Sequence, residues 1–274
     1  MKQLSSRVII YIIVILLIVV GVYYTLNREE DKGLSIGIIQ IVEHPSLDAA
    51  RNGFKELLAE NGYEEGQNVT YDFQNAQGDM GNANTIAKKF ANSNHDLILA
   101  IATPTAQAAA NAIQDTPILI TAVTDPVEAG LVESIENPNT NVTGTSDLTP
   151  VKEQLNLLTE IAPDAKTVGT IYNAGETNSV VQAELTKKTC EELNLNLEEA
   201  TADTSGNVQQ AAQSLAGNVD ALYIFTDNTV VSALESVIQV AEENNLPLIV
   251  GEPDSVERGG LATRGLSYHE LGHK

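Results

Sequence analysis

The feature that most constrains this chain is the regular alternation of short apolar runs with amphipathic segments that begins at Leu34. Short runs rich in Ile, Leu and Val are typical of buried strands, whereas apolar residues that recur every three or four positions are typical of helices. The predicted strands are 34–42, 68–74, 96–102, 117–123, 141–146, 167–172, 195–200, 221–225, 248–250 and 261–265. The predicted helices are 47–61, 82–92, 104–113, 151–161, 180–193, 208–215 and 230–244. Strands that alternate with helices in this way form parallel sheets with helices on both faces.

The alternation is interrupted once, over residues 125–140, where Pro, Gly, Asn and Asp cluster. The chain on each side of this break is long enough for one doubly wound lobe of about 100 residues. We therefore expect a first lobe over 33–124, a crossover over 125–146 and a second lobe over 147–266, with a cleft between the lobes. Residues 267–274 are expected to begin a helix that returns to the first lobe.

Polar or helix-capping residues follow the predicted strands of both lobes, and ligands of doubly wound sheets bind outside the carboxyl ends of the strands. Thr103 and Asp125 each precede a proline, so both fit the N-cap of a helix. The helix capped by Thr103 is expected to hold a ligand carboxylate with its free N–H groups, and Thr105 to add a hydroxyl. Asp227 or Glu176 of the facing lobe is expected to pair with a ligand ammonium. Each Thr-Pro or Asp-Pro pair taken singly is also explained by helix initiation alone.

An uncharged run of 19 residues, Val8–Leu26, lies near the N-terminus. As a helix it would be about 28 Å long, enough to cross a bilayer core of about 30 Å. Lys2 and Arg7 precede it, so the positive-inside bias predicts a cytoplasmic N-terminus and extracytoplasmic lobes. Residues 1–32 are therefore expected to form a signal anchor and spacer, which attaches the protein to the cell membrane through one transmembrane helix. A cleaved signal peptide is the alternative, but no small-x-small cleavage site ends the run.

Composition excludes several classes of function. Asp and Glu outnumber Lys and Arg by 37 to 15, for a formal net charge of −22. A nucleic-acid partner is not expected, because binding phosphates needs a basic face. The single cysteine, Cys190, excludes an intramolecular disulfide and a Cys-rich zinc site, and no glycine-rich phosphate motif is present. We expect no cofactor, no metal and no catalytic residue.

Eight segments occur in order over residues 34–272: IGIIQIVEHPSLDAARNGFKELLAENGY, YDFQNAQGD, ATPTAQAAANA, TAVTDPVEAGLV, NVTGTSD, IYNAGETNSVVQ, IFTDNTVVSALE and GLSYHELG. Together they resemble the tryptophan/tyrosine-type substrate-binding protein family of bacterial ABC transporters. The resemblance implies the type I periplasmic-binding-protein fold, in which two lobes close on a ligand. It also implies that matching positions bind the ligand: Gln40, Glu43, His44, Gln74, Thr103, Thr105, Thr124, Tyr172, Glu176, Asn178, Ser179, Thr226 and Asp227.

The leading prediction is an extracytoplasmic solute-binding component of an ABC importer that is not an enzyme. It would bind an amino acid, aromatic according to the resemblance, and work with permease and ATPase subunits. The alternative is a membrane-anchored sensor that uses the same clamp. A zinc hydrolase is a remote alternative, because His269 to His273 matches the H-E-x-x-H motif, but a single residue follows His273 and a third ligand downstream is missing.

The resemblance also implies a difference at the C-terminus. The family continues beyond the position of Lys274 with a helix and return segment of several dozen residues that complete the first lobe. We therefore expect the chain to be a fragment or a truncated gene product. An apolar stripe of its first lobe would lack cover, and that lobe would fold less well than the second.

Overall fold

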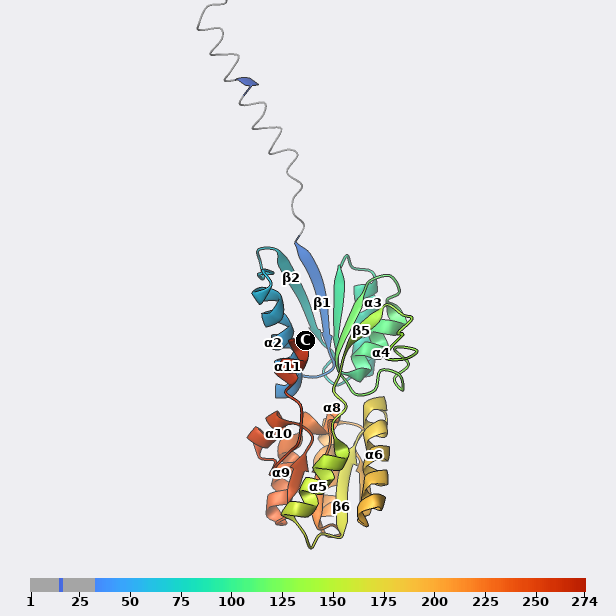
Figure 1. The fold of residues 1–274 in the computed structure, drawn as a ribbon, viewed down its shortest axis with the longest axis vertical. Helices are drawn as coiled ribbons and strands as arrows, with labels where there is room; N and C mark the ends of the chain where they lie inside the picture. The colour runs from blue at the N-terminus through green and yellow to red at the C-terminus, as the bar shows by residue number, and fades with distance from the viewer. Residues whose placement is uncertain (1–14, 17–32) are drawn as a thin grey trace, which may run out of the picture.

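The computed structural model describes residues 15–16 and 33–274, and its two lobes each contain one parallel sheet (Figure 1). The first sheet has the strand order β2-β1-β3-β4-β5, and the second has the order β7-β6-β8-β9. Every strand pairs with its neighbours in parallel. The predicted α/β class with two parallel sheets is confirmed.

The strands alternate with helices along most of the chain. The strands are β1 (Leu34–Gln40), β2 (Val69–Asn75), β3 (Leu97–Ile101), β4 (Ile118–Val123), β5 (Val142–Ser146), β6 (Thr167–Tyr172), β7 (Asn196–Thr201), β8 (Ala221–Ile224) and β9 (Leu248–Val250). The helices are α2 (Pro45–Glu60), α3 (Met80–Ala91), α4 (Thr103–Ala112), α5 (Val151–Ile161), α6 (Thr177–Leu193), η1 (Ser205–Asn207), α7 (Val208–Ala216), α8 (Asn228–Val231), α9 (Leu234–Glu243), α10 (Pro253–Arg258) and α11 (Tyr268–Gly272).

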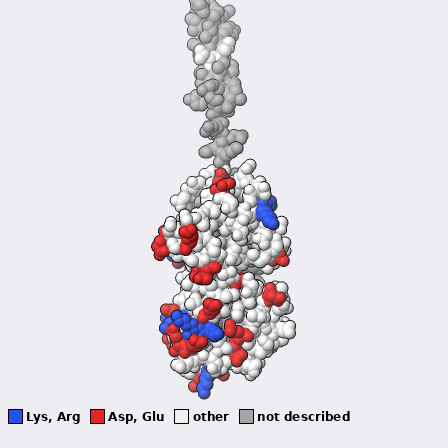
Figure 2. Space-filling view, turned by 90° about the vertical axis from the view of Figure 1, so that its right-hand side faces the viewer, with Lys and Arg blue, Asp and Glu red and all other residues white. Residues whose placement is uncertain are grey.

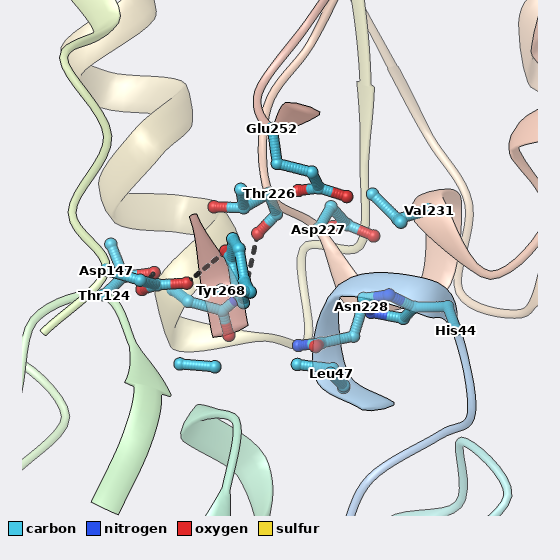
Figure 3. A pocket seen from close by; sticks show the side chains of 12 residues that line it. His44, Leu47, Thr124, Asp147, Thr226, Asp227, Asn228, Val231, Glu252 and Tyr268 are labelled. Atoms are coloured by element: carbon cyan, nitrogen blue, oxygen red, sulfur yellow. Dashed lines mark hydrogen bonds between the residues drawn. The ribbon is translucent and has the colours of Figure 1, made fainter. Parts of the chain in front are cut away.

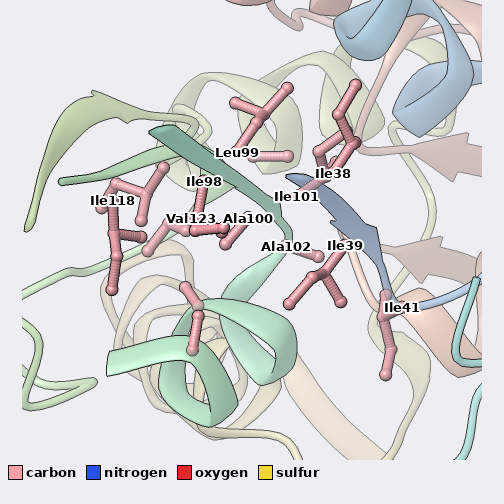
Figure 4. Close-up of a cluster of buried hydrophobic side chains, with 14 of the residues drawn as sticks. Ile38, Ile39, Ile41, Ile98, Leu99, Ala100, Ile101, Ala102, Ile118 and Val123 are labelled. Atoms are coloured by element: carbon pink, nitrogen blue, oxygen red, sulfur yellow. The ribbon is translucent and has the colours of Figure 1, made fainter. Parts of the chain in front are cut away.

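Strand β8 shows how one sheet builds two cores. Because side chains alternate across a strand, Leu222 and Ile224 pack with α7 and α9, whereas Ala221 and Tyr223 pack with α5 and α6. In the first lobe, the central strands β1, β3 and β4 are nearly continuous runs of Ile, Leu, Val and Ala (Figure 4). Such runs are expected where both faces of a parallel sheet are covered.

Helix α11 returns the chain to the first lobe and packs against α2, as Figure 1 shows. Two glycines allow the two backbones to approach closely. A Cβ added at Gly53 would lie 2.1 Å from the carbonyl oxygen of His269, and one added at Gly272 would lie 1.9 Å from that of Ala50. Beside α11 a groove of about 280 Å³ is lined by residues that include Phe54, Leu99, Leu119 and Leu271. It stays a prediction that an apolar stripe of the first lobe lacks a covering helix.

Three expected elements differ in the structure. The predicted strand 261–265 is reduced to one bridge between Ala262 and Ile249, because the Gln154 side chain binds the Arg264 carbonyl and the chain leaves the sheet toward the first lobe. The predicted helix 230–244 is two helices, α8 and α9. They are separated at Ser232, whose hydroxyl donates to the Thr229 carbonyl and competes with the helical bonds.

The third difference concerns residues 125–146, which we expected to be a crossover. Their last part forms β5, which pairs with β4 and extends the first sheet. Buried Val142 attaches this strand to the core of the first lobe, so the chain crosses to the second lobe only after Ser146. Asp125 caps no helix, because its carboxylate accepts the N–H groups of Val127 and Glu128 within a turn.

The predicted membrane anchor, Val8–Leu26, falls almost wholly outside the described residues. Among the residues that the structure describes, no helix has both the length and the apolar character that a membrane crossing requires. On the face shown in Figure 2, Asp and Glu side chains are spread over both lobes, with Lys and Arg in smaller groups.

Candidate functional site

The carboxyl ends of both sheets border a cavity between the lobes (Figure 3). The first lobe contributes residues that follow β1 or lie near the ends of β4 and β5, and the second contributes residues that follow β8 or β9 or begin α6. Tyr268 enters from α11. The cavity is lined by His44, Leu47, Ala122, Thr124, Asp147, Asn178, Thr226, Asp227, Asn228, Val231, Glu252 and Tyr268. Its volume of about 10 Å³ leaves room for roughly one water-sized group.

Asp227 is at the centre of the second-lobe wall. Its carboxylate accepts the N–H of Asn173 at 2.6 Å, the hydroxyl of Ser179 at 2.6 Å and the N–H of Val230 at 2.7 Å. The last bond makes Asp227 the N-cap of α8. Burial and the neighbouring Glu176 raise the pKa of Asp227 to about 7. This carboxylate therefore has partners from its own lobe on both oxygens.

Glu176 and Gln182 complete the same wall from behind. Glu176 accepts from the amides of Asn228 at 2.5 Å and Asn178 at 3.3 Å, and from the hydroxyl of Thr229 at 2.8 Å. Gln182 binds Thr226 twice, through the Thr226 hydroxyl at 2.9 Å and the Thr226 carbonyl at 3.0 Å. These bonds fix the polar side chains of the second lobe before any ligand arrives.

Asp147, Tyr268 and Glu252 lie where the chain passes between the lobes. The Tyr268 hydroxyl donates to Asp147, which also accepts from Thr124 at 3.2 Å, and Figure 3 shows the Tyr268 ring aimed at Asp147. Glu252 accepts from Ser46 of the first lobe at 3.1 Å, so it bridges the two lobes directly. Burial raises the pKa of Asp147 and raises that of Glu252 to about 7.

The cavity carries an acidic charge. Asp147, Asp227 and Glu252 line it, and the described lining contains no Lys or Arg. His44 adds no positive charge, because burial and Arg258 lower its pKa to about 3. A ligand group with a positive charge would relieve the repulsion among these buried carboxyls.

A second cavity between the lobes adjoins the first and shares Asn228 with it. Its volume is about 220 Å³, and its lining includes Ile41, Val42 and Asp79 of the first lobe and Glu176, Thr229 and Ser232 of the second. This cavity offers the room for a larger ligand group that the first cavity lacks.

A family model described as ABC transporter substrate binding protein matches residues 35–274 of this chain. The chain belongs to this family of ABC transporter substrate-binding proteins. A curated relative, the tyrosine-binding protein of Clostridioides difficile, is 48% identical over 250 residues, which cover 90% of this chain and 72% of the relative. The predicted resemblance is confirmed, and the family is one of solute-binding proteins rather than enzymes.

Two solved structures of related binding proteins differ in how well they match this substrate-binding protein. A domain from Streptococcus pneumoniae in complex with L-Trp is 35% identical, covers 88% of this chain and 81% of its own, and has a TM-score of 0.85. The ligand-free, open structure of a substrate-binding protein from Clostridium difficile is 50% identical, covers 88% and 82%, and has a TM-score of 0.63. This family member is thus more similar in overall arrangement to the complex than to the open structure.

Five of the thirteen candidate residues line the cavity of this substrate-binding protein. They are His44, Thr124, Asn178, Thr226 and Asp227. Ser179 and Glu176 bind wall residues from behind, and Glu176 also lines the adjoining cavity. Tyr172 packs against Phe225, with ring centroids 6.0 Å apart, and Glu43 is exposed.

The remaining first-lobe candidates are bound within their own lobe or lie outside the lining. Gln40 binds Arg51 and Asp48, and Gln74 binds Asp72. The Thr105 hydroxyl donates back to the carbonyls of Ile101 and Ala102.

Thr103 is not the N-cap that we expected, because Ala102 occupies that position of α4 and Thr103 is the first helical residue. Ala102 has a φ of 81°, and Ala122 at the end of the neighbouring strand has a φ of 56°. A positive φ is uncommon for residues with a Cβ, and such strain concentrates at functional sites. The turn at Ala102 leaves the buried Thr103 hydroxyl without a partner among the described residues.

Seven lining residues were not among the candidates: Leu47, Ala122, Asp147, Asn228, Val231, Glu252 and Tyr268. Glu252 and Asn228 do follow predicted strands, so the rule of strand ends points to them, although the resemblance does not. Tyr268 had no such signal, because it reaches the cavity only when α11 packs on α2.

The H-E-x-x-H motif has a structural role in this family member. His269 faces Glu56 at 2.7 Å and His273 faces Glu60 at 3.1 Å, so both histidines join α11 to α2. Within residues 15–16 and 33–274, no group of three or more His, Cys, Asp or Glu residues is arranged to hold a metal ion.

Proposed function

We propose that this protein is the extracytoplasmic solute-binding component of an ABC importer, that it binds an aromatic amino acid between its lobes, and that it passes this ligand to permease and ATPase subunits. We further propose that residues 8–26 attach it to the cell membrane. The strongest support is the arrangement of the lobes. It matches a 35% identical complex with L-Trp at a TM-score of 0.85, but matches a 50% identical open structure at only 0.63.

The choice of an amino acid is supported by two observations. The curated relative that is 48% identical is a tyrosine-binding protein. The buried carboxyls of Asp147, Asp227 and Glu252 surround the cavity without a Lys or Arg in the described lining, which favours a ligand with an ammonium group. A neutral sugar would offer these carboxyls no charged partner.

The size of the cavity implies that binding requires the lobes to move. With a volume of about 10 Å³, the first cavity cannot admit an aromatic amino acid from solution. The ligand therefore enters while the lobes are apart, and contacts such as Ser46 with Glu252 and Gln107 with Thr177 form as they close. Closure is the signal that a permease would recognise.

A thermal-shift screen of the purified protein against the common amino acids and a set of sugars tests this function. A ligand present at 100 times its Kd should add about 2.7 kcal/mol to the free energy of unfolding. We expect tyrosine, tryptophan or phenylalanine to give the largest shift. A shift with sugars and none with any amino acid would contradict the proposal.

A further inference from the structure

Two polar atoms on the cavity wall are buried without a hydrogen-bond partner among the described residues. They are Nδ1 of His44 and Oδ1 of Asn178, and their residues are 8% and 3% exposed. Leaving such an atom unpaired costs about 1–3 kcal/mol, so native proteins rarely do so without a reason. The two residues come from opposite lobes, since His44 precedes α2 and Asn178 begins α6.

Both atoms are able to accept a hydrogen bond. The amide nitrogen of Asn178 donates to Glu176 at 3.3 Å and to Ser179 at 3.2 Å, which leaves the amide oxygen, an obligatory acceptor, toward the free side. Burial lowers the pKa of His44 to about 3, so its ring is neutral, and Nδ1 is the acceptor when Nε2 carries the proton. In that tautomer, a donor group that lies between the lobes would satisfy both atoms.

The carboxylates of the second lobe already accept hydrogen bonds from protein groups. Asp227 already accepts three hydrogen bonds from Asn173, Ser179 and Val230. Glu252 already accepts from Ser46 and Ser255. These groups attract a cation through their charge, and Asn178 and His44 add two buried atoms that have no partner among the described residues.

We propose that Asn178 Oδ1 and His44 Nδ1 receive the primary ammonium group of the ligand, with one hydrogen bond from each lobe. This inference rests on the proposed function and names the residues by which the site selects an amine. The cavity admits one water-sized group, which is also the size of an ammonium. The other atoms of the ligand extend past Asn228 into the adjoining cavity of about 220 Å³.

Titration calorimetry with two probes tests the proposal on the full chain: L-tyrosine and 3-(4-hydroxyphenyl)propionate, the same molecule without its amine. Wild-type protein is expected to prefer L-tyrosine, because the deaminated probe leaves both acceptors unpaired. Asn178→Ala and His44→Ala should each weaken L-tyrosine binding by about 10- to 100-fold. They should change binding of the deaminated probe by less than about 3-fold, so that the preference between the probes falls.

Matched variants separate hydrogen bonding from shape. His44→Asn places an amide oxygen near the position of Nδ1 and should keep most of the preference, whereas His44→Gln, which resembles Nε2, should not. Asn228→Ala removes another cavity amide that donates to Glu176, and it should weaken both probes equally. If Asn178→Ala does not fold, the comparison of His44→Asn with His44→Gln is enough to test the proposal. Both variants should fold, because the His44 ring makes no hydrogen bond to the described residues.

Equal losses for the two probes in both alanine variants would overturn the proposal, since they would show that the side chains only shape the cavity. A wild-type protein that binds the two probes equally well would overturn it too. A folded wild-type protein that binds neither probe, nor tryptophan or phenylalanine, would instead contradict the proposed function.

Discussion

The second-lobe wall of the cavity is held by hydrogen bonds of its own lobe, whereas on the first-lobe wall Thr124, Asp147 and Tyr268 are joined in this way but the His44 ring is not, among the described residues. Asp227 accepts three such bonds, but the ring of His44 accepts none from the described residues. Leu47 and Ala122 make much of the rest of the first-lobe wall. The second lobe thus presents a polar surface that its own residues hold in place, while the His44 ring of the first lobe has an atom without such a partner among the described residues.

The largest expected effect is that of removing the Asp227 carboxylate. Asp227→Ala leaves two buried donors and one part-buried donor without an acceptor and removes the N-cap of α8, so it should lower the free energy of unfolding by about 3–5 kcal/mol. His44→Asn on the other wall should change it by less than about 1 kcal/mol, because Asn is a good N-cap. Urea unfolding measures both variants. Similar losses would mean that the walls do not differ in the way described.

The contact of α2 with α11 is a second point at which the lobes differ, because the first lobe depends on this returning helix. Gly53→Ala would place a Cβ 2.1 Å from the His269 carbonyl oxygen and push α11 away. We expect a loss of about 2–3 kcal/mol in unfolding free energy and weaker ligand binding, because Tyr268 moves with the helix. Gly217→Ala in the second lobe, where an added Cβ meets no atom within 4 Å, is the control. An unchanged stability for Gly53→Ala would show that α11 is not tightly docked.

A titratable group on each wall should make stability depend on pH, and the two dependences should have opposite signs. Glu252 has its pKa raised from 4.5 to about 7, so the native state holds a proton that the unfolded state has lost, and its contribution to stability falls as the pH rises from about 4.5 to 7. His44 has its pKa lowered from 6.5 to about 3, so the unfolded state takes up a proton first, and its contribution rises from about pH 3 to 6.5.

Comparing wild type with Glu252→Gln and with His44→Asn isolates these contributions. From pH 4.5 to 7, the difference in unfolding free energy between wild type and Glu252→Gln should fall. The difference between wild type and His44→Asn should rise, and each change should be roughly 1–3 kcal/mol. Differences with the same sign would contradict this reading of the walls. A saturating amine ligand should reduce the effect of Glu252, because an ammonium stabilises its ionised form.

The smallest expected effect concerns local opening. Strand β5 is an edge strand in which only Val142 is buried, whereas all four residues of β8 are buried. Hydrogen exchange should show β5 amides opening with a free energy about 1–2 kcal/mol below that of β8 amides. Limited proteolysis should likewise cut the first lobe before the second. Equal protection would show that the groove beside α11 does not weaken the first lobe.

Gln40 and Glu252 show how far the candidate site could be predicted. Gln40 ends a strand and matches the family, yet its amide is used inside the first lobe by Arg51 and Asp48. Glu252 also follows a strand and does face the cavity, where Ser46 of the other lobe binds it. The position of a polar residue at a strand end is a local property, but its direction depends on neighbours that are distant in sequence.

The sequence by itself determined the alternation of strands and helices and the two parallel sheets, because burial of apolar side chains follows the local period of each element. It also indicated the family, through the eight segments that resemble it. Only the tertiary structure decided which polar groups meet. The Tyr268 hydroxyl binds Asp147 across 121 residues, and His44 and Asn178 face one cavity from two lobes, each with an atom that has no partner within the described part of the chain. Hydrogen bonds depend on distance and direction in space, and these are set by how the lobes close rather than by any segment of the chain.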